Sequence, residues 1–361
     1  MTASPGRNTT APATRQWPTS AVNKGKGKPK PPPATADGAA GDHLPWVEKY
    51  RPASLSDLVA HEDMTNTIIK FIDEKRLPHL LFYGPPGTGK TSTILACARR
   101  LYGPQYKSMI LELNASDDRG IDVVREQIKN FASTRKIFSS GFKLIVLDEA
   151  DAMTTAAQAA LRRIIEKYTK NVRFCIICNY VSKIILALQS RCTRFRFNPL
   201  EPDQVERRLD FICRLEGVDL RPDGMQALLR LSQGDMRRAL NVAQSTFAAF
   251  GTVDEAAVYS TTGTPLPRDV ERCTDWLMNE DMTTAIVHMA SLRVDKGYAL
   301  ADLLGDMFLF LARMEMPDPA KIVVYEALAE IEYNLSLGCS EAIQAGALAA
   351  AFRLAVELAS K

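Results

Sequence analysis

Apolar positions follow two alternating patterns between about residues 44 and 200. Short continuous apolar runs, typical of strands buried on both faces, separate longer segments in which apolar residues recur every three or four positions. We expect strands at 80–83, 109–113, 143–148, 173–178 and 193–197, and helices at 62–75, 91–102, 120–132, 154–168 and 182–189. Because strands and helices alternate, the pattern predicts an α/β fold in which a parallel sheet carries helices on both faces.

Beyond residue 200 the pattern is helical only, and two proline-containing breaks divide it. The first break is Asn198-Pro199-Leu200-Glu201-Pro202, and the second is Gly263-Thr264-Pro265-Leu266-Pro267. Proline and glycine interrupt regular structure, so these breaks mark boundaries. They predict an α/β domain over residues 42–200, a small helical lid domain over 201–262 and an all-helical C-terminal domain over 263–361.

Residues 1–41 differ from the rest in composition. Six of them are Lys or Arg, Asp37 is the only acidic residue, and Pro, Gly, Ser, Thr and Ala dominate. Such a segment cannot bury a core, so we expect a disordered basic tail, with a transit peptide as the alternative. Since the tail carries more than the whole chain's net charge of +3, a nucleic-acid surface elsewhere must be a local stripe.

Seven cysteines are scattered along the chain and no secretory signal is recognised, which predicts a reducing compartment. Cys175 and Cys178 have zinc-like spacing, but no second pair or histidine lies nearby, and positions i and i+3 of a strand point to opposite faces. We therefore expect no zinc. We also expect no membrane span, because polar residues interrupt the two long apolar stretches near the C-terminus: Asp302, Asp306, Arg313, Gln344, Arg353 and Glu357.

A phosphate-binding loop follows the first predicted strand. It reads Gly84-Pro85-Pro86-Gly87-Thr88-Gly89-Lys90-Thr91, which fits the pattern G-x-x-x-x-G-K-[ST], and a helix pattern follows it directly. A strand, a glycine-rich turn and a helix start direct several backbone N–H groups at one polyphosphate. We expect these loop residues and Ser92 to bind ATP, Lys90 to reach the β- and γ-phosphates, and Thr91 to ligate Mg²⁺.

Polar residues end two later strands at the edge where ligands bind in such sheets. Asp148 and Glu149 follow the apolar run 143–147, and Asn179 follows the run 173–178. We expect Asp148 to hold Mg²⁺, Glu149 to act as general base toward the attacking water, and Asn179 to orient that water or contact the γ-phosphate.

Two arginines elsewhere have candidate roles in phosphate chemistry. Arg237 lies near a helix start in the lid domain, where it could face the nucleotide. Arg191, in Ser190-Arg191-Cys192, could reach a neighbouring subunit's γ-phosphate as an arginine finger. Each of them would otherwise be an ordinary solvated arginine.

Basic residues lie on one side of two successive predicted helices. Arg119 lies at the start of the helix 120–132, which also carries Arg125 and Lys129, while Arg162 and Lys167 lie on the helix 154–168. A solvated face is the simple interpretation. Two stripes in one nucleotide-binding domain favour a track for a DNA phosphate backbone, and without interleaved aromatic residues we expect no base readout.

Five stretches together resemble the replication factor C small subunits, which are clamp-loader members of the AAA+ ATPases. Besides the phosphate loop, they are Leu44-Pro45-Trp46-Val47-Glu48-Lys49-Tyr50-Arg51-Pro52, Glu112-Leu113-Asn114-Ala115-Ser116-Asp117-Asp118-Arg119-Gly120, Leu147-Asp148-Glu149-Ala150-Asp151 and Ser190-Arg191-Cys192. The resemblance covers about residues 44–361. It implies an AAA+ core with a helical lid and a C-terminal helical collar.

The resemblance implies roles for individual residues. Val47, Glu48, Arg51 and Val59 would surround the adenine and its phosphates, and Asn114 would be a switch that restrains Glu149. Asn179 would be sensor 1, Arg237 sensor 2 and Arg191 the finger in trans, while residues 120–132 and 154–168 would line a DNA channel. The partners implied are four other subunits in a heteropentamer, a sliding clamp and primer–template DNA in the nucleus.

Two alternatives compete with this interpretation. Residues 148–151 read Asp-Glu-Ala-Asp, as in the RNA helicases of that name, although those enzymes need a second α/β domain that residues 203–361 do not predict. The other alternative is a scaffold subunit that binds ATP but seldom hydrolyses it.

Overall fold

The computed structural model describes residues 44–58, 60–74, 76–115, 121–133 and 141–360, with the backbone alone at Ser56 and over 121–125. The expected basic tail, residues 1–41, lies outside the described residues. The chain divides into one unit up to Leu44 and a second unit, Pro45–Lys361, which contains all of the helices and strands described.

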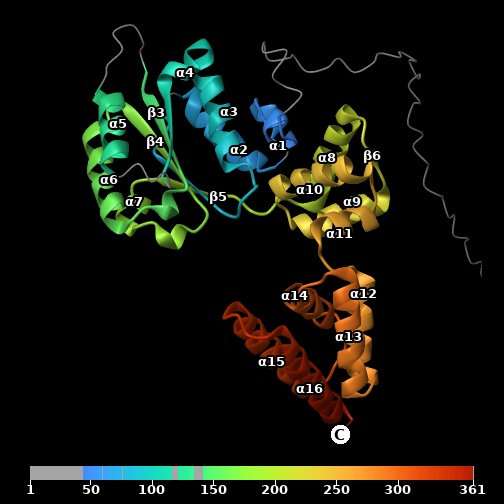
Figure 1. The fold of residues 1–361 in the computed structure, drawn as a ribbon. Coiled ribbons are helices and arrows are strands. Elements are labelled where there is room, and N and C mark those ends of the chain that lie inside the picture. Colours follow the sequence, from blue (N-terminus) through green and yellow to red (C-terminus); the bar gives the residue numbers. More distant parts are fainter. Residues whose placement is uncertain (1–43, 59, 75, 116–120, 134–140, 361) are drawn as a thin grey trace, which may run out of the picture. The chain divides into compact units, whose positions relative to one another are not determined.

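Five parallel strands form one sheet in the order β2-β3-β4-β1-β5 (Figure 1). They are β1 Leu80–Tyr83, β2 Ile110–Asn114, β3 Lys143–Asp148, β4 Val172–Cys178 and β5 Thr193–Arg196. The predicted parallel sheet is confirmed. Because the strands are parallel and β4 lies between β3 and β1, the carboxyl ends of β3, β4 and β1 lie next to one another at one edge of the sheet.

Helices cover both faces of this sheet (Figure 1). In β1, alternate residues enter different cores: Leu80 and Phe82 pack on one face of the sheet, and Leu81 packs on the other. Cys175 and Cys178 likewise lie on opposite faces, as their spacing predicted. One face carries α2 Glu62–Asp73, α3 Lys90–Tyr102 and α4 Tyr106–Met109, and the other carries α5 Ile121–Ser133, α6 Thr155–Tyr168 and α7 Leu186–Gln189.

The helix predicted at 182–189 is wrong in its first half. A 3-10 turn, η4 Val181–Lys183, comes first, and the chain then extends before α7 begins. The buried side chain of Gln158 explains the break: its amide donates to Lys183 O at 2.9 Å, and its oxygen accepts from Ile185 N at 2.8 Å. Because Lys183 O and Ile185 N already have hydrogen-bond partners in Gln158, they do not need the partners that a helix would provide. The other 3-10 turns are η1 Leu55–Asp57, η2 Gly103–Gln105 and η3 Ala150–Ala152.

The segment after the sheet is helical, as predicted, with one addition. Its elements are α8 Pro202–Glu216, β6 Asp219–Leu220, α9 Pro222–Ser232, α10 Met236–Phe250, β7 Thr252–Val253 and α11 Glu255–Thr262. The two short strands pair in parallel and were not predicted, because two residues show no periodicity. The core of this segment also takes in Trp46 of α1 Trp46–Lys49, far away in sequence.

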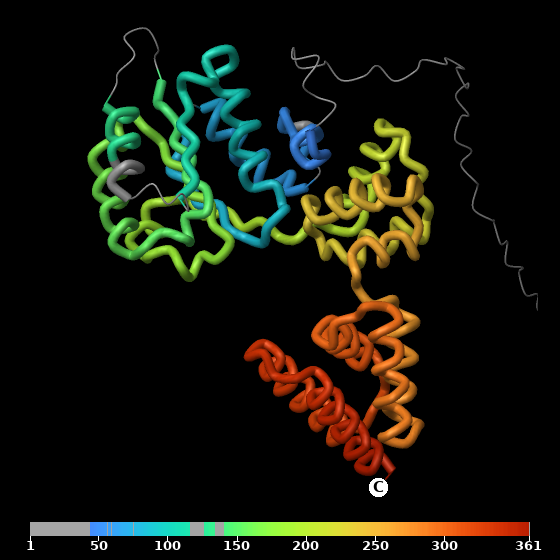
Figure 2. Tube along the Cα trace, in the orientation of Figure 1, coloured from blue at the N-terminus to red at the C-terminus, as the bar shows by residue number. Residues whose placement is uncertain are grey.

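The last five helices bury a core of their own, which includes Cys273, Leu303 and Phe352. They are α12 Pro267–Asn279, α13 Met282–Lys296, α14 Leu300–Leu311, α15 Asp318–Ser336 and α16 Glu341–Ala359. The two longest, α15 and α16, lie side by side (Figure 2). By length and composition α16 could cross a membrane, but that is weak evidence, since a helix that packs Leu348 and Phe352 into a protein core passes the same test.

Candidate nucleotide-binding site

A pocket opens where three parts of the chain meet: the segment around α1, the loop after β1, and the helices α8 and α10. The expected contacts that line it are Val47, Glu48, Arg51, Pro86, Gly87, Thr88, Gly89, Lys90, Thr91, Ser92, Asp148, Glu149, Asn179 and Arg237. Val59 lies outside the described residues, between the lining residues Leu58 and Ala60. The structure thus brings together side chains from positions 47 to 237.

The phosphate loop turns tightly between β1 and α3, and two of its glycines are required by close contacts. A Cβ on Gly84, whose φ is +143°, would lie 2.1 Å from Phe197 O. A Cβ on Gly87, whose φ is +67°, would lie 1.6 Å from Asp235 Oδ1. A side chain at position 84 would thus collide with the backbone just after β5, and one at position 87 would adopt a strained left-handed φ and displace the side chain of Asp235.

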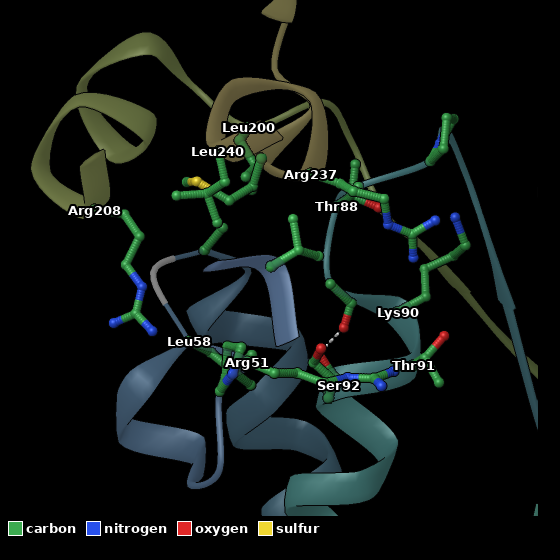
Figure 3. A pocket seen from close by; sticks show the side chains of 18 of the residues that line it. Arg51, Leu58, Thr88, Lys90, Thr91, Ser92, Leu200, Arg208, Arg237 and Leu240 are labelled. Carbon is green, nitrogen blue, oxygen red and sulfur yellow. Dashed lines mark hydrogen bonds between the residues drawn. The ribbon is translucent and has the colours of Figure 1, made fainter. Parts of the chain in front are cut away.

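Lys90 is the first residue of α3, and its side chain is buried beneath the loop. Its Nζ lies 2.8 Å from both Gly84 O and Pro85 O, and 3.1 Å from Asn179 Oδ1. Burial lowers the pKa of Lys90; the charges of Asp148 and Asp151 oppose this shift, and the charge of Arg237 adds a smaller lowering effect. The two cations, Lys90 and Arg237, lie close to each other in the pocket (Figure 3), an arrangement that an anion would stabilise.

The oxygen groups expected to hold a metal ion lie next to each other. Thr91 Oγ1 donates to Asp148 Oδ2 at 2.6 Å, and Asp148 Oδ1 accepts from Glu149 N at 2.9 Å. One hydroxyl and one carboxylate fit Mg²⁺, which keeps water and phosphate oxygens as its remaining ligands. The described residues contain no group of three His, Cys, Asp or Glu side chains that could hold a metal ion.

The residues around Glu149 fix the backbone at the edge of the sheet. Glu149 itself has the left-handed φ of +54°, uncommon for a residue with a side chain. Asn114 pairs with Asp148 in the β2–β3 ladder, which places it beside the strand end that carries Glu149. Asp151, which sequence reasoning gave no role, accepts from the backbone N–H groups of Asn179 and Tyr180 at 3.3 and 3.4 Å.

Helix α10 contacts the phosphate loop through its N-terminus. Met236 N donates to Gly87 O at 3.3 Å, and Asp235 caps the helix by accepting from the N–H groups of Arg237 and Arg238. The cap fixes the start of the helix on the loop, so that Arg237 extends into the pocket (Figure 3).

The segment around α1 belongs to the helices rather than to the sheet. Trp46 N donates to Gln244 of α10 at 2.9 Å, and Glu216 of α8 binds both Lys49 Nζ at 2.7 Å and the Tyr50 hydroxyl. Arg208 of α8 donates to Tyr50 O at 2.8 Å and lines the pocket near Arg51 (Figure 3). Sequence reasoning missed Arg208 and Glu216, because each resembles an ordinary charge on an amphipathic helix.

Arg191 does not line the pocket of its own chain. It follows α7, with a side chain 36% exposed, and its Nη2 lies 2.6 Å from Oε1 of Glu166 on α6. The structure thus keeps this arginine apart from Lys90 and Asp148, an arrangement compatible with a role toward another subunit.

The expected DNA track is only partly described. Arg119 lies outside the described residues, and so does the side chain of Arg125. Lys129 on α5 and Lys167 on α6 are exposed on helices that cover the same face of the sheet (Figure 1). Arg162 is half-buried, and its Nε lies 3.9 Å from Glu166, so it is less free than a solvated stripe residue.

Comparison with known proteins identifies close relatives over most of the chain. Replication factor C subunit 3 of Schizosaccharomyces pombe is 57% identical over 88% of this chain and 93% of its own length. Replication factor C subunit 5 of Homo sapiens is 58% identical over 88% of this chain and 93% of its own length.

Family models and a solved structure agree with these relatives. Residues 80–200 match the ATPase family associated with various cellular activities (AAA), and residues 265–351 match the replication factor C C-terminal domain. A mutant of Thermotoga maritima RuvB matches with a TM-score of 0.50 at 13% identity, covering 74% of this chain and 93% of that one, which indicates the fold alone. By its relatives and by both family models, the chain belongs to the replication factor C family of AAA ATPases.

Proposed function

We propose that this chain is an ATP-hydrolysing subunit of a heteropentameric clamp loader, which opens a sliding clamp and loads it onto primer–template DNA in replication and repair. The observation that carries the proposal is the assembled site: Lys90, Asn179 and the Thr91–Asp148 pair converge in one pocket. The replication factor C relatives support the same conclusion.

The lining residues of the pocket support ATP with Mg²⁺ as its ligand. Thr91 and Asp148 would hold the ion, which neutralises charge on the β- and γ-phosphates when it is bound. The loop from Gly84 to Gly89 would surround the phosphates with its backbone N–H groups, and Lys90 would leave its carbonyl partners for the γ-phosphate. Val47, Glu48, Arg51 and Val59 would line the adenine end, with Arg208 holding this segment through Tyr50 O.

Hydrolysis would use groups at the carboxyl ends of the strands. Glu149 would accept the proton of the attacking water, and Asn179 would orient the water beside the γ-phosphate. Asn114 would restrain Glu149 until DNA binds, and Arg237 would couple the helix α10 to the phosphates. Arg191 would contact the ATP of the adjacent subunit.

The remaining parts have assigned roles in the same proposal. Residues 42–200 form the ATPase domain, 201–262 the lid and 263–361 a collar that joins four other subunits in the nucleus. The residues that contact DNA phosphates are Arg119, Arg125, Lys129, Arg162 and Lys167. Neither zinc nor a membrane has a role in this function. An RNA helicase is excluded by family, since residues 265–351 match the replication factor C C-terminal domain.

A single substitution separates an active subunit from a scaffold that only binds ATP. Glu149→Gln, introduced in this chain alone and assembled with unaltered partners, should lower single-turnover hydrolysis while ATP binding persists. Unchanged hydrolysis, measured on a complex whose mass confirms five subunits, would favour the scaffold.

A further inference from the structure

An ion pair joins helix α6 to the residue that we assign as the arginine finger. Glu166 Oε1 lies 2.6 Å from Arg191 Nη2, and Arg191 Nη1 donates to Ala187 O at 2.7 Å and to Ser190 Oγ at 3.4 Å. A guanidinium has five N–H donors, so these three contacts leave donors for a phosphate. The side chain is held within its own subunit and yet is 36% exposed.

Glu166 has a fixed position from which to hold the finger. Its helix buries Leu161, Ile164 and Ile165 against the sheet, which sets the direction of the opposite face. Arg162 Nε, one turn earlier, lies 3.9 Å from the same Glu166 oxygen. This carboxylate therefore lies between two guanidinium groups, one on its own helix and one on the turn after α7.

We propose that Glu166 is a positioning residue that orients Arg191 for the ATP of the adjacent subunit. This inference rests on the proposed function, in which Arg191 acts in trans. A long, partly exposed arginine samples many rotamers, and ordering it at each turnover would raise the barrier. An exposed ion pair contributes little to stability, so the contact matters through geometry rather than through folding.

The proposal is tested by ATP hydrolysis of the assembled complex carrying Glu166→Ala, Arg191→Ala or both. Glu166→Ala should lower the Arg191-dependent rate of ATP hydrolysis about tenfold, because the catalytic arginine is then displaced. The KM for ATP should not change. In the Arg191→Ala background, Glu166→Ala should have no further effect. Glu74→Ala at the end of α2 removes an exposed carboxylate that has no role in the proposed function and should leave the rate unchanged.

Each other outcome has a definite meaning. If Arg191→Ala alone changes nothing, the finger assignment in the proposed function fails. If Arg191→Ala lowers the rate but Glu166→Ala does not, the positioning role is wrong. A faster rate in Glu166→Ala would overturn it in favour of an inhibitory contact, and additive losses in the double variant would reduce Glu166 to a structural residue.

Discussion

At the scale of single residues, Lys90 shows how function conflicts with stability. Because its charge is costly inside the protein, burial lowers its pKa, although two carbonyls and Asn179 bind the ammonium group. Lys90→Met should weaken ATP binding roughly a hundredfold, since charge-assisted hydrogen bonds contribute about 1.5–3 kcal/mol each. Calorimetric titration measures the affinity. Equal affinity in the variant and the unaltered chain would remove Lys90 from the site, and a large drop in melting temperature would show that it supports the fold.

His79 predicts how stability depends on pH. It is buried, and its Nδ1 accepts from Phe174 N at 3.1 Å. Burial, aided by Arg173, lowers its pKa from 6.5 to about 4, so the folded chain holds the ring neutral. As pH falls, the ring of His79 takes up a proton in the unfolded chain before it does so in the folded chain. The stability associated with the neutral ring is therefore complete above about pH 6.5 and is lost as pH falls toward 4. In urea unfolding, His79→Gln should therefore lose less stability than the unaltered chain between pH 7 and pH 5, and equal losses would contradict this.

At the scale of elements, α1 is attached to α8 and supplies one wall of the nucleotide pocket. Burial alone would raise the pKa of Glu216, but hydrogen bonds from Lys49 and Tyr50 lower it, so the attachment is complete at neutral pH and weakens in acid. Glu216→Ala should reduce ATP affinity about threefold to tenfold although the residue does not line the pocket, because an ion pair of this kind contributes about 1 kcal/mol. Glu206→Ala, exposed on the same helix, is the matched control. If Glu216→Ala binds ATP as tightly as Glu206→Ala does, the attachment of α1 does not contribute to nucleotide binding.

At the scale of the whole molecule, the proposed DNA track should act through charge alone. Lys129 and Lys167 are exposed on α5 and α6. Replacing both with Ala in the assembled loader should reduce the log–log salt slope of primer–template binding by about two units, one for each phosphate contact, without changing sequence preference. Lys296→Ala on α13 serves as the control. An unchanged slope would return both lysines to an ordinary solvated face, and a sequence-dependent loss would reveal base contacts.

The sheet and the chemical groups around the pocket could be predicted from the amino-acid sequence alone. Buried strands and amphipathic helices have different periods, so the five strands were located within one residue of their ends. The phosphate loop and the acidic residues after β3 were also evident, because their chemistry depends on local spacing. Where local signals were absent, prediction failed: the two-residue strands β6 and β7 were missed, and the helix at 182–189 was predicted too long.

Which distant groups meet depends on how the folded elements pack, and the sequence did not predict it. Lys90 contacts Asn179, Gly87 fits against Asp235, and Glu166 holds Arg191, in each case through the packing of separate elements. The attachment of α1 to α8 and α10 is of the same kind, since Lys49 and Glu216 are far apart in the chain. Periodicity records which face of an element is buried, but the partner of a given charge depends on how whole elements pack, and that is a property of the folded chain.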